Sequence, residues 1–185
     1  MVVKIISGGQ TGVDRAALDF AMARGLTAGG WCPKGRRAED GVIPRHYPLM
    51  ETHREDYPYR TILNVKDSDG TLILFTGTLR GGSALTDRFA RENKVPCLSI
   101  DLSGEHDPSL VADWVCTNRI QVLNIAGPRE SENRGIHGAA FRFLDCWWRR
   151  QTDKLAVTAI GFPRPVGNEG AIARTKDHIS LFFSR

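Results

Sequence analysis

Short runs of apolar, β-prone residues alternate along this chain with segments that have the periodicity of α-helices. The runs lie at residues 2–6, 71–75, 96–100 and 120–126, with a weaker one at 26–32. Apolar residues recur at helical spacing in 13–24, 83–93, 108–118 and 136–150. Alternating strands and helices favour parallel βαβ units, and near-continuous apolar runs are typical of strands covered on both faces. We therefore predict an α/β protein with a Rossmann-like, doubly wound parallel sheet and helices on both faces.

The chain of 185 residues suits one domain with a small extension. We assign residues 1–150 to a Rossmann-like ligand-binding domain. Residues 151–185 form a C-terminal extension, for which a hairpin against the sheet edge and an oligomerisation arm both stay open. Residues 33–56 are too rich in polar residues, Pro and Gly for a plain helix, and a loop of this length is usually functional or mobile.

Composition adds mild constraints. The formal net charge of +4 and the pI of about 9.0 suit an anionic ligand, although a slightly basic solvated surface explains them as well. No apolar run approaches the ~20 residues needed to span a bilayer, and the N-terminal run is too short for a signal peptide. The four cysteines include no CxxC pair, so we expect no metal site. We expect a cytoplasmic protein.

Glycines follow two predicted strands, at the edge where open α/β sheets bind their ligands. The loop after 2–6 contains Gly8, Gly9, Gln10, Thr11 and Gly12, and the loop after 71–75 contains Gly77, Gly81, Gly82, Ser83 and Thr86. Each loop opens a helix, whose free N–H groups and positive dipole end favour an anion. A single glycine-rich turn would indicate little. Two such loops can meet at one ligand if their strands are neighbours, which favours the strand order 2-1-3-4-5.

Neither loop has a standard nucleotide-binding pattern. A Walker A motif requires a lysine after its last glycine, and none follows Gly12. The dinucleotide pattern GxGxxG requires glycine where Gln10 stands. ATP hydrolysis and ordinary NAD binding are therefore disfavoured.

Charged residues at the same predicted edge complete the candidate site. They are Asp14 and Arg15 in the first turn of the first helix, Lys34, Arg36 and Asp40 in the loop after 26–32, and Arg129 after 120–126. A cation at position 15 opposes the helix dipole by ~0.3–1 kcal/mol unless an anion lies nearby. We predict that Arg15 reaches an anion, and the alternative is an exposed arginine beside a carboxylate. The basic and acidic residues of 33–45 either contact phosphates and hydroxyls or form a solvated loop.

Five stretches occur in an order that resembles the molybdenum-cofactor (Moco) carrier protein family. They read GGQTGVDRAALDFA, GWCPKGRRAEDGVIPRHYPL, RTILNVKDSDGTLIL, LRGGSALT and NIAGPRES. This family belongs to a Rossmann-like superfamily that includes lysine-decarboxylase-like phosphoribohydrolases and DNA-processing proteins. The resemblance implies a carrier without chemistry of its own, which holds molybdenum cofactor (molybdopterin) or a related phosphorylated, nucleotide-like ligand at the glycine loops.

The resemblance also bears on partners. It implies a small phosphorylated ligand, and molybdoenzymes or cofactor-synthesis proteins as protein partners. We further expect a homo-oligomer and no membrane association. Trp31 and Tyr47 would offer stacking surface to a pterin.

Two other functions stay open. The first is a nucleoside-monophosphate phosphoribohydrolase. Enzymes of this kind have a loop with the pattern PGGxGTxxE, whose glutamate acts as an acid and base in catalysis. Here the proline, the later glycine and the glutamate are absent, and Asp87 stands one residue out of place. A nucleic-acid binder is less favoured, because the basic residues gather at one predicted rim without interleaved aromatics.

Overall fold

The structure is a computed structural model that describes residues 1–159, with side chains described to residue 152. The helices of this part are α1 (Val13–Ala23), α2 (Tyr57–Lys66), α3 (Gly81–Glu92), α4 (Ser109–Thr117) and α5 (Ile136–Ala159), with a 3-10 turn at Lys34–Arg36. The strands are β1 (Lys4–Ile6), β2 (Thr27–Gly29), β3 (Trp31–Cys32), β4 (Arg37–Ala38), β5 (Gly41–Val42), β6 (Met50–Glu51), β7 (Gly70–Phe75), β8 (Cys97–Asp101) and β9 (Val122–Ala126).

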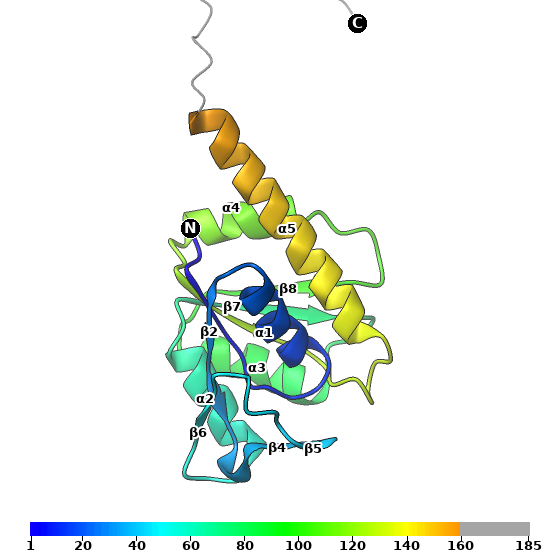
Figure 1. Ribbon diagram of the computed structural model, residues 1–185. Helices are drawn as coiled ribbons and strands as arrows, with labels where there is room; N and C mark the ends of the chain where they lie inside the picture. Colours follow the sequence, from blue (N-terminus) through cyan, green and yellow to red (C-terminus); the bar gives the residue numbers. More distant parts are fainter. Residues whose placement is uncertain (160–185) are drawn as a thin grey trace, which may run out of the picture.

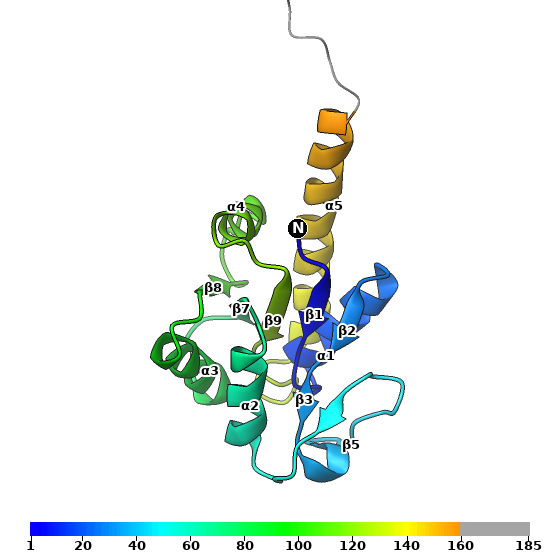
Figure 2. The same cartoon turned by 90° about the vertical axis from the view of Figure 1, so that its left-hand side faces the viewer.

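Five parallel strands form the central sheet, in the order β2-β1-β9-β7-β8 (Figure 2). Helices α1, α4 and α5 pack together on one face, and α2 packs with α3 on the other (Figure 1). The main core lies between the sheet and the first group, where Phe20, Ile125 and Trp147 are fully buried. The predicted doubly wound α/β fold is therefore confirmed.

The predicted strand order 2-1-3-4-5 is wrong. The strand predicted as the fifth, β9, pairs with β1 on one side and with β7 on the other. This central place suits its sequence, because Leu123 and Ile125 are fully buried and Asn124 donates its side-chain N–H to Thr71 Oγ1 at 3.2 Å. Strands β1 and β7 are consequently not neighbours, and the expected crevice between them does not exist.

Helix α5 has the stripe that its periodicity predicts. Its buried residues are Ile136, Ala140, Phe143, Leu144 and Trp147. The helix continues past residue 150 to Ala159, and in Figure 1 its last turns extend beyond α4 and away from the sheet. The hairpin or arm expected within 151–185 falls largely on residues 160–185, outside the described residues.

The irregular segment 33–56 is held by one arginine. The guanidinium of Arg36 donates to the carbonyl oxygens of Ile43, Pro44, Tyr47 and Leu49 at 3.0, 2.9, 2.9 and 3.1 Å. The side chains of Ile43, Tyr47 and Leu49 in turn pack on Leu18 of α1 and on Cys32. Arg36, predicted as a ligand contact, therefore organises this loop.

Helix α2 was not predicted, although its start carries a recognisable signal. Asp56 accepts the N–H of Tyr59 at 2.9 Å as the N-cap, and Pro58 follows in the first turn. An aspartate with a proline two residues later is a typical helix start.

Two glycines with positive φ allow a test of close packing. Gly12 has φ 74° and ψ −129°, a combination open essentially to glycine alone, and Gly25 has φ 67°. A Cβ at Gly12 would lie 2.4 Å from the Pro128 carbonyl oxygen, whereas one at Gly25 would meet nothing within 4 Å. We expect Gly25→Ala to lower the free energy of unfolding by about 1–2 kcal/mol, the cost of the backbone angle alone. Gly12→Ala should cost about 1–3 kcal/mol more, because backbone must also move.

Urea denaturation of both variants measures this difference. Similar unfolding free energies for the two variants would mean that the backbone around Pro128 can move away from position 12 at little cost, and that its packing against α1 contributes little to stability.

Candidate functional site

The first glycine loop is filled by the protein itself. A Cβ at Gly8, Gly9 or Gly12 would lie 1.8, 2.4 and 2.4 Å from atoms of Arg60, Leu49 and Pro128, respectively. The N–H of Val13, at the start of α1, donates to the Pro128 carbonyl at 3.2 Å. The space beside these glycines is therefore already occupied by a guanidinium group, an apolar side chain and a backbone segment, and the start of α1 is closed to an added anion.

Arg15 is held by a carboxylate of the same chain. Its Nη1 and Nη2 atoms lie 2.6 and 2.7 Å from the two Asp40 oxygens, and its Nε donates to the Gly9 carbonyl at 3.2 Å. The hydrogen bond from Arg15 lowers the pKa of Asp40 below its ordinary value. The Arg15 guanidinium thus already has acceptors within the protein at Nε, Nη1 and Nη2.

Three more predicted residues have local partners or face solvent. Thr11 Oγ1 donates to Glu39 and accepts the N–H of Glu130 at 3.1 Å. Asp14 is buried and lies 3.3 Å from Arg60, and burial raises its pKa against the opposing charge of Arg60. Lys34 is exposed on the 3-10 turn.

The second glycine loop is open. A Cβ at Gly77 or Gly82 would meet nothing within 4 Å, and one at Gly81 would meet only Glu132 Oε1, at 4.0 Å. Gly77 and Gly81 have positive φ, which itself favours glycine, but Gly82 does not. Neither its backbone angle nor its neighbours thus require glycine at position 82. Its missing side chain leaves space for another molecule to approach the backbone.

Among the described residues, the N–H groups in the first turn of α3 also have no acceptor outside the helix. In the other four helices of the described part, a first-turn N–H donates to Pro128, Asp56, Asp107 or Glu130. The N-cap residue of α3, Arg80, makes no side-chain capping bond. The free N–H groups of a helix start and its positive dipole end together favour a bound anion.

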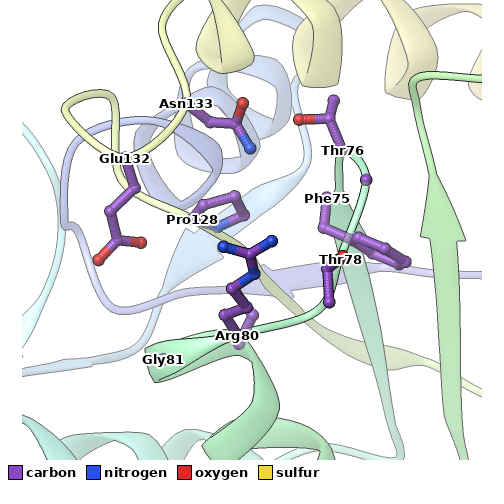
Figure 3. Close-up of a pocket in the computed structure, with 10 residues that line it drawn as sticks. Phe75, Thr76, Thr78, Arg80, Gly81, Pro128, Glu132 and Asn133 are labelled. Carbon is purple, nitrogen blue, oxygen red and sulfur yellow. The ribbon is translucent and has the colours of Figure 1, made fainter.

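A cavity of about 560 Å³ lies beside this turn, between the loops that follow β7 and β9 (Figure 3). It is lined by Phe75, Thr76, Gly77, Thr78, Arg80, Gly81, Ser83, Pro128, Glu132 and Asn133. In Figure 3 Arg80 points from the α3 turn into the space between Pro128 and Phe75. Ser83 is 3% exposed, and its Oγ has no hydrogen-bond partner among the described residues. This cavity therefore combines free donors with a cation.

A second, smaller cavity of about 60 Å³ shares Glu132 with the first. It is lined by Gln10, Tyr57, Arg60, Thr61, Gly82, Leu85, Thr86, Gly127, Arg129 and Glu132. Arg129 lies 3.3 Å from Glu132 and 3.8 Å from Glu39, with its guanidinium 5.7 Å from the centre of the Tyr57 ring. Residues from all three loops after β1, β7 and β9 thus meet around this small cavity.

The two cavities divide the predicted site residues into three groups, since most of these residues line neither cavity. Gly77, Gly81 and Ser83 line the large cavity, and Gln10, Gly82, Thr86 and Arg129 line the small one. Gly8, Gly9, Thr11, Gly12, Asp14, Arg15, Lys34, Arg36 and Asp40 line neither.

Sequence reasoning missed Arg60, Arg80, Glu132 and Asn133. Arg80 directly precedes the glycines of its loop, and Glu132 and Asn133 follow Arg129 closely, so position alone could have suggested them. Arg60 lies on α2, the helix that was not predicted.

The residues predicted to stack on a pterin and the candidate catalytic aspartate lie outside both cavities. Trp31 Nε1 donates to Asp67 at 2.7 Å, Tyr47 is buried, and neither lines a cavity described above. Asp87 pairs with Arg91 at 2.8 Å. The described residues contain no cluster of three or more His, Cys, Asp or Glu suited to a metal ion. None of the helices within residues 1–159 is long and apolar enough to cross a membrane.

The ion pair between Arg15 and Asp40 should make the stability of the protein depend on pH. Because the pKa of Asp40 is lowered in the folded protein, its stabilising effect is present above the ordinary value of 3.8 and is lost as the pH falls through the folded-state pKa. We expect Asp40→Asn to lower the unfolding free energy by about 0.5–1 kcal/mol at neutral pH, since Asp40 is half exposed. At a pH below the folded-state pKa of Asp40, the variant and wild type should be equally stable.

Urea denaturation at the two pH values is the measurement. Glu55→Gln, which removes the more exposed pair with Arg37, is the matched control and should change little. If Asp40→Asn does not affect stability while Arg15→Ala weakens anion binding, Arg15 is a ligand contact, as its sequence position suggests.

Comparison with known proteins places this geometry in a family. The model of the circularly permutated YpsA SLOG family matches residues 5–148. The crystal structure of the putative molybdenum carrier protein from Syntrophus aciditrophicus SB is 51% identical, with a TM-score of 0.78, over 79% of this chain and 94% of that chain. No curated protein matches significantly.

The strand order has the form expected for a permutation. When the strands are counted from β9, the order β2-β1-β9-β7-β8 becomes 3-2-1-4-5, the order of the Rossmann sheet. The large cavity then lies between the first and fourth strands, at the switch point where such sheets bind ligands. The chain belongs to the circularly permutated YpsA SLOG family.

Proposed function

We propose that this protein binds and carries a phosphorylated small molecule, either molybdenum cofactor or a related nucleotide-like ligand, in the large cavity. The observation that carries the proposal is the uncapped first turn of α3, which opens on this cavity at the switch point of the sheet. The similarity to a protein named as a putative molybdenum carrier supports the same class of ligand.

The phosphate would bind at the start of α3. The N–H groups of Gly81, Gly82 and Ser83 lie in the first turn, and the buried Ser83 Oγ supplies a further donor. Arg80 adds a guanidinium group that can bind two phosphate oxygens at once. Gly82 follows Gly81 and lines the small cavity rather than the large one, and its lack of a Cβ keeps the N–H groups of this turn uncovered.

The organic part of the ligand would occupy the rest of the cavity. Its volume of about 560 Å³ lies within the ~300–1,000 Å³ usual for small-molecule sites. Phe75 and Pro128 offer apolar surface, and the Asn133 amide offers a donor and an acceptor to the edge of a heterocycle. These residues fit a phosphorylated pterin, and the molybdenum would stay on the dithiolene of the cofactor itself. Such a carrier would exchange its ligand with molybdoenzymes or cofactor-synthesis proteins.

A nucleoside-monophosphate phosphoribohydrolase is the second candidate, and Glu132 is the observation that favours it. Its carboxylate lines both cavities beside the glycine turn, whereas Asp87, the sequence-based candidate, pairs with Arg91 outside them. However, the Glu132 carboxylate is already paired with Arg129 at 3.3 Å, and the loop lacks the proline, the later glycine and the glutamate of the hydrolase pattern. We therefore expect no release of adenine from AMP above background.

Identification of the natural ligand tests the carrier directly. The purified protein is denatured, and released small molecules are identified by mass spectrometry and by pterin fluorescence. A pterin or a nucleotide in stoichiometric amount is the expected result. If adenine is instead released from AMP at about 1 per second, and Glu132→Gln abolishes this release, the protein is a hydrolase.

Calorimetric titration with AMP tests the binding turn. We expect Ser83→Ala to weaken AMP binding by about five- to tenfold through the loss of one hydrogen bond. Arg80→Ala should weaken it by about tenfold or more, because a charged donor is lost. The control is Arg88→Ala, which removes an exposed arginine of the same helix that lies 3.7 Å from Glu92. Equal affinities in all four proteins would exclude the start of α3 as the phosphate site.

A further inference from the structure

The small cavity contains a buried amide whose orientation is fixed. Gln10 is 6% exposed, and its Oε1 accepts the N–H of Thr11 at 3.0 Å and the N–H of Glu39 at 2.9 Å. If the oxygen and nitrogen of the amide were exchanged, its NH2 group would face the N–H groups of Thr11 and Glu39, and donors would oppose donors. The oxygen is therefore the atom that faces these two N–H groups. Gln10 Nε2 is then a donor, and it is buried without an acceptor among the described residues.

A charged donor lines the same cavity. Arg60 is largely buried, and its Nε also lacks an acceptor among the described residues. The space left by Gly8 admits its guanidinium, and Asp14 contacts only the Nη2 end, at 3.3 Å. A buried donor without a partner destabilises the fold, and a charged one does so more strongly. Two such groups around one cavity therefore indicate an occupant that accepts hydrogen bonds.

The charges around the cavity favour an anion. Arg60 and Arg129 both line it, and Gly82 presents the start of α3. Three carboxylates contact these cations: Glu132 at 3.3 Å and Glu39 at 3.8 Å from Arg129, and Asp14 at 3.3 Å from Arg60. Only Glu132 is among the lining residues, so the lining carries two cations and one carboxylate.

We propose that this small cavity is a second anion subsite, which binds a tetrahedral oxyanion such as a phosphoryl group through Gln10 and Arg60. Its volume of about 60 Å³ admits one compact group but no nucleoside. Gly81 lines the large cavity, Gly82 lines the small one and Glu132 lines both, which puts the two cavities within reach of one ligand. In joining the subsite to that ligand, the inference rests on the proposed function. The oxyanion is then either a second phosphoryl group of the ligand or free phosphate.

Gln10→Glu is the sharpest variant. It keeps an oxygen to accept the two backbone N–H groups but replaces the donor NH2 with a second carboxylate oxygen, which repels an anion. Gln151→Glu is the matched control. Within the described part of the chain, Gln151 Nε2 is also buried without a partner, but it lies on α5 and does not line the cavity. The double variant Asp14→Asn, Arg60→Gln removes the guanidinium without leaving a buried charge unpaired. Thermal unfolding verifies that each variant is folded.

Calorimetric titrations with inorganic phosphate, AMP and ADP measure the effect. We expect Gln10→Glu and the double variant to weaken phosphate binding by at least about tenfold, and Gln151→Glu to leave it unchanged. If the subsite takes a group of the ligand, ADP binds more tightly than AMP, and Gln10→Glu removes this advantage. If it takes free phosphate, ADP and AMP bind alike and phosphate binding alone depends on Gln10.

The subsite is overturned if Gln10→Glu binds phosphate and ADP as wild type does, or if wild type binds neither, in which case water fills the cavity. Failure of the subsite and failure of the proposed function are distinguishable. AMP binding that depends on Ser83 but never on Gln10 retains the carrier without a second subsite. Phosphate binding that depends on Gln10, without any binding of AMP, retains the subsite and rejects the carrier.

Discussion

The contact between the chain after β9 and the start of α1 decides which part of the sheet edge can receive a ligand. The Pro128 carbonyl accepts the N–H of Val13 and lies where a side chain at position 12 would be. One helix start is thereby satisfied within the protein. The start of α3, two strands away from β1 in the sheet, keeps its donors and faces the large cavity. The position of the candidate site thus follows from a packing interaction in a different loop.

Much of the fold could be predicted because its signals are local. Apolar runs marked the five strands of the central sheet, and helical periodicity marked α1, α3, α4 and α5. The strand order could not be read in this way, because pairing depends on contacts between distant segments. Placing β9 between β1 and β7 requires knowing which strand is buried on both faces and flanked on both edges, and several apolar runs in this chain were equally suitable.

The candidate site was predicted less completely, for a related reason. Gly12 and Gly82 are both glycines that follow an apolar strand, and the sequence does not distinguish them. In the structure Pro128 packs against Gly12, whereas nothing packs against Gly82, which lines the small cavity. The sequence likewise does not show which arginine has an internal partner and which lines a cavity. Arg15 stands at a helix start but is held by Asp40, whereas Arg60 comes from an unpredicted helix and enters the small cavity. Only neighbours in space distinguish these roles.

The two kinds of glycine have different evolutionary fates. Gly12 is required by the fold, because its φ is positive and a side chain there would overlap the Pro128 backbone. Gly82 has neither a positive φ nor a close neighbour, so selection for folding does not preserve it. On the proposed function, a lineage that stopped using the ligand would retain Gly12 and lose Gly82 by drift. The residue at position 82 in relatives would then report whether the proposed site is still in use.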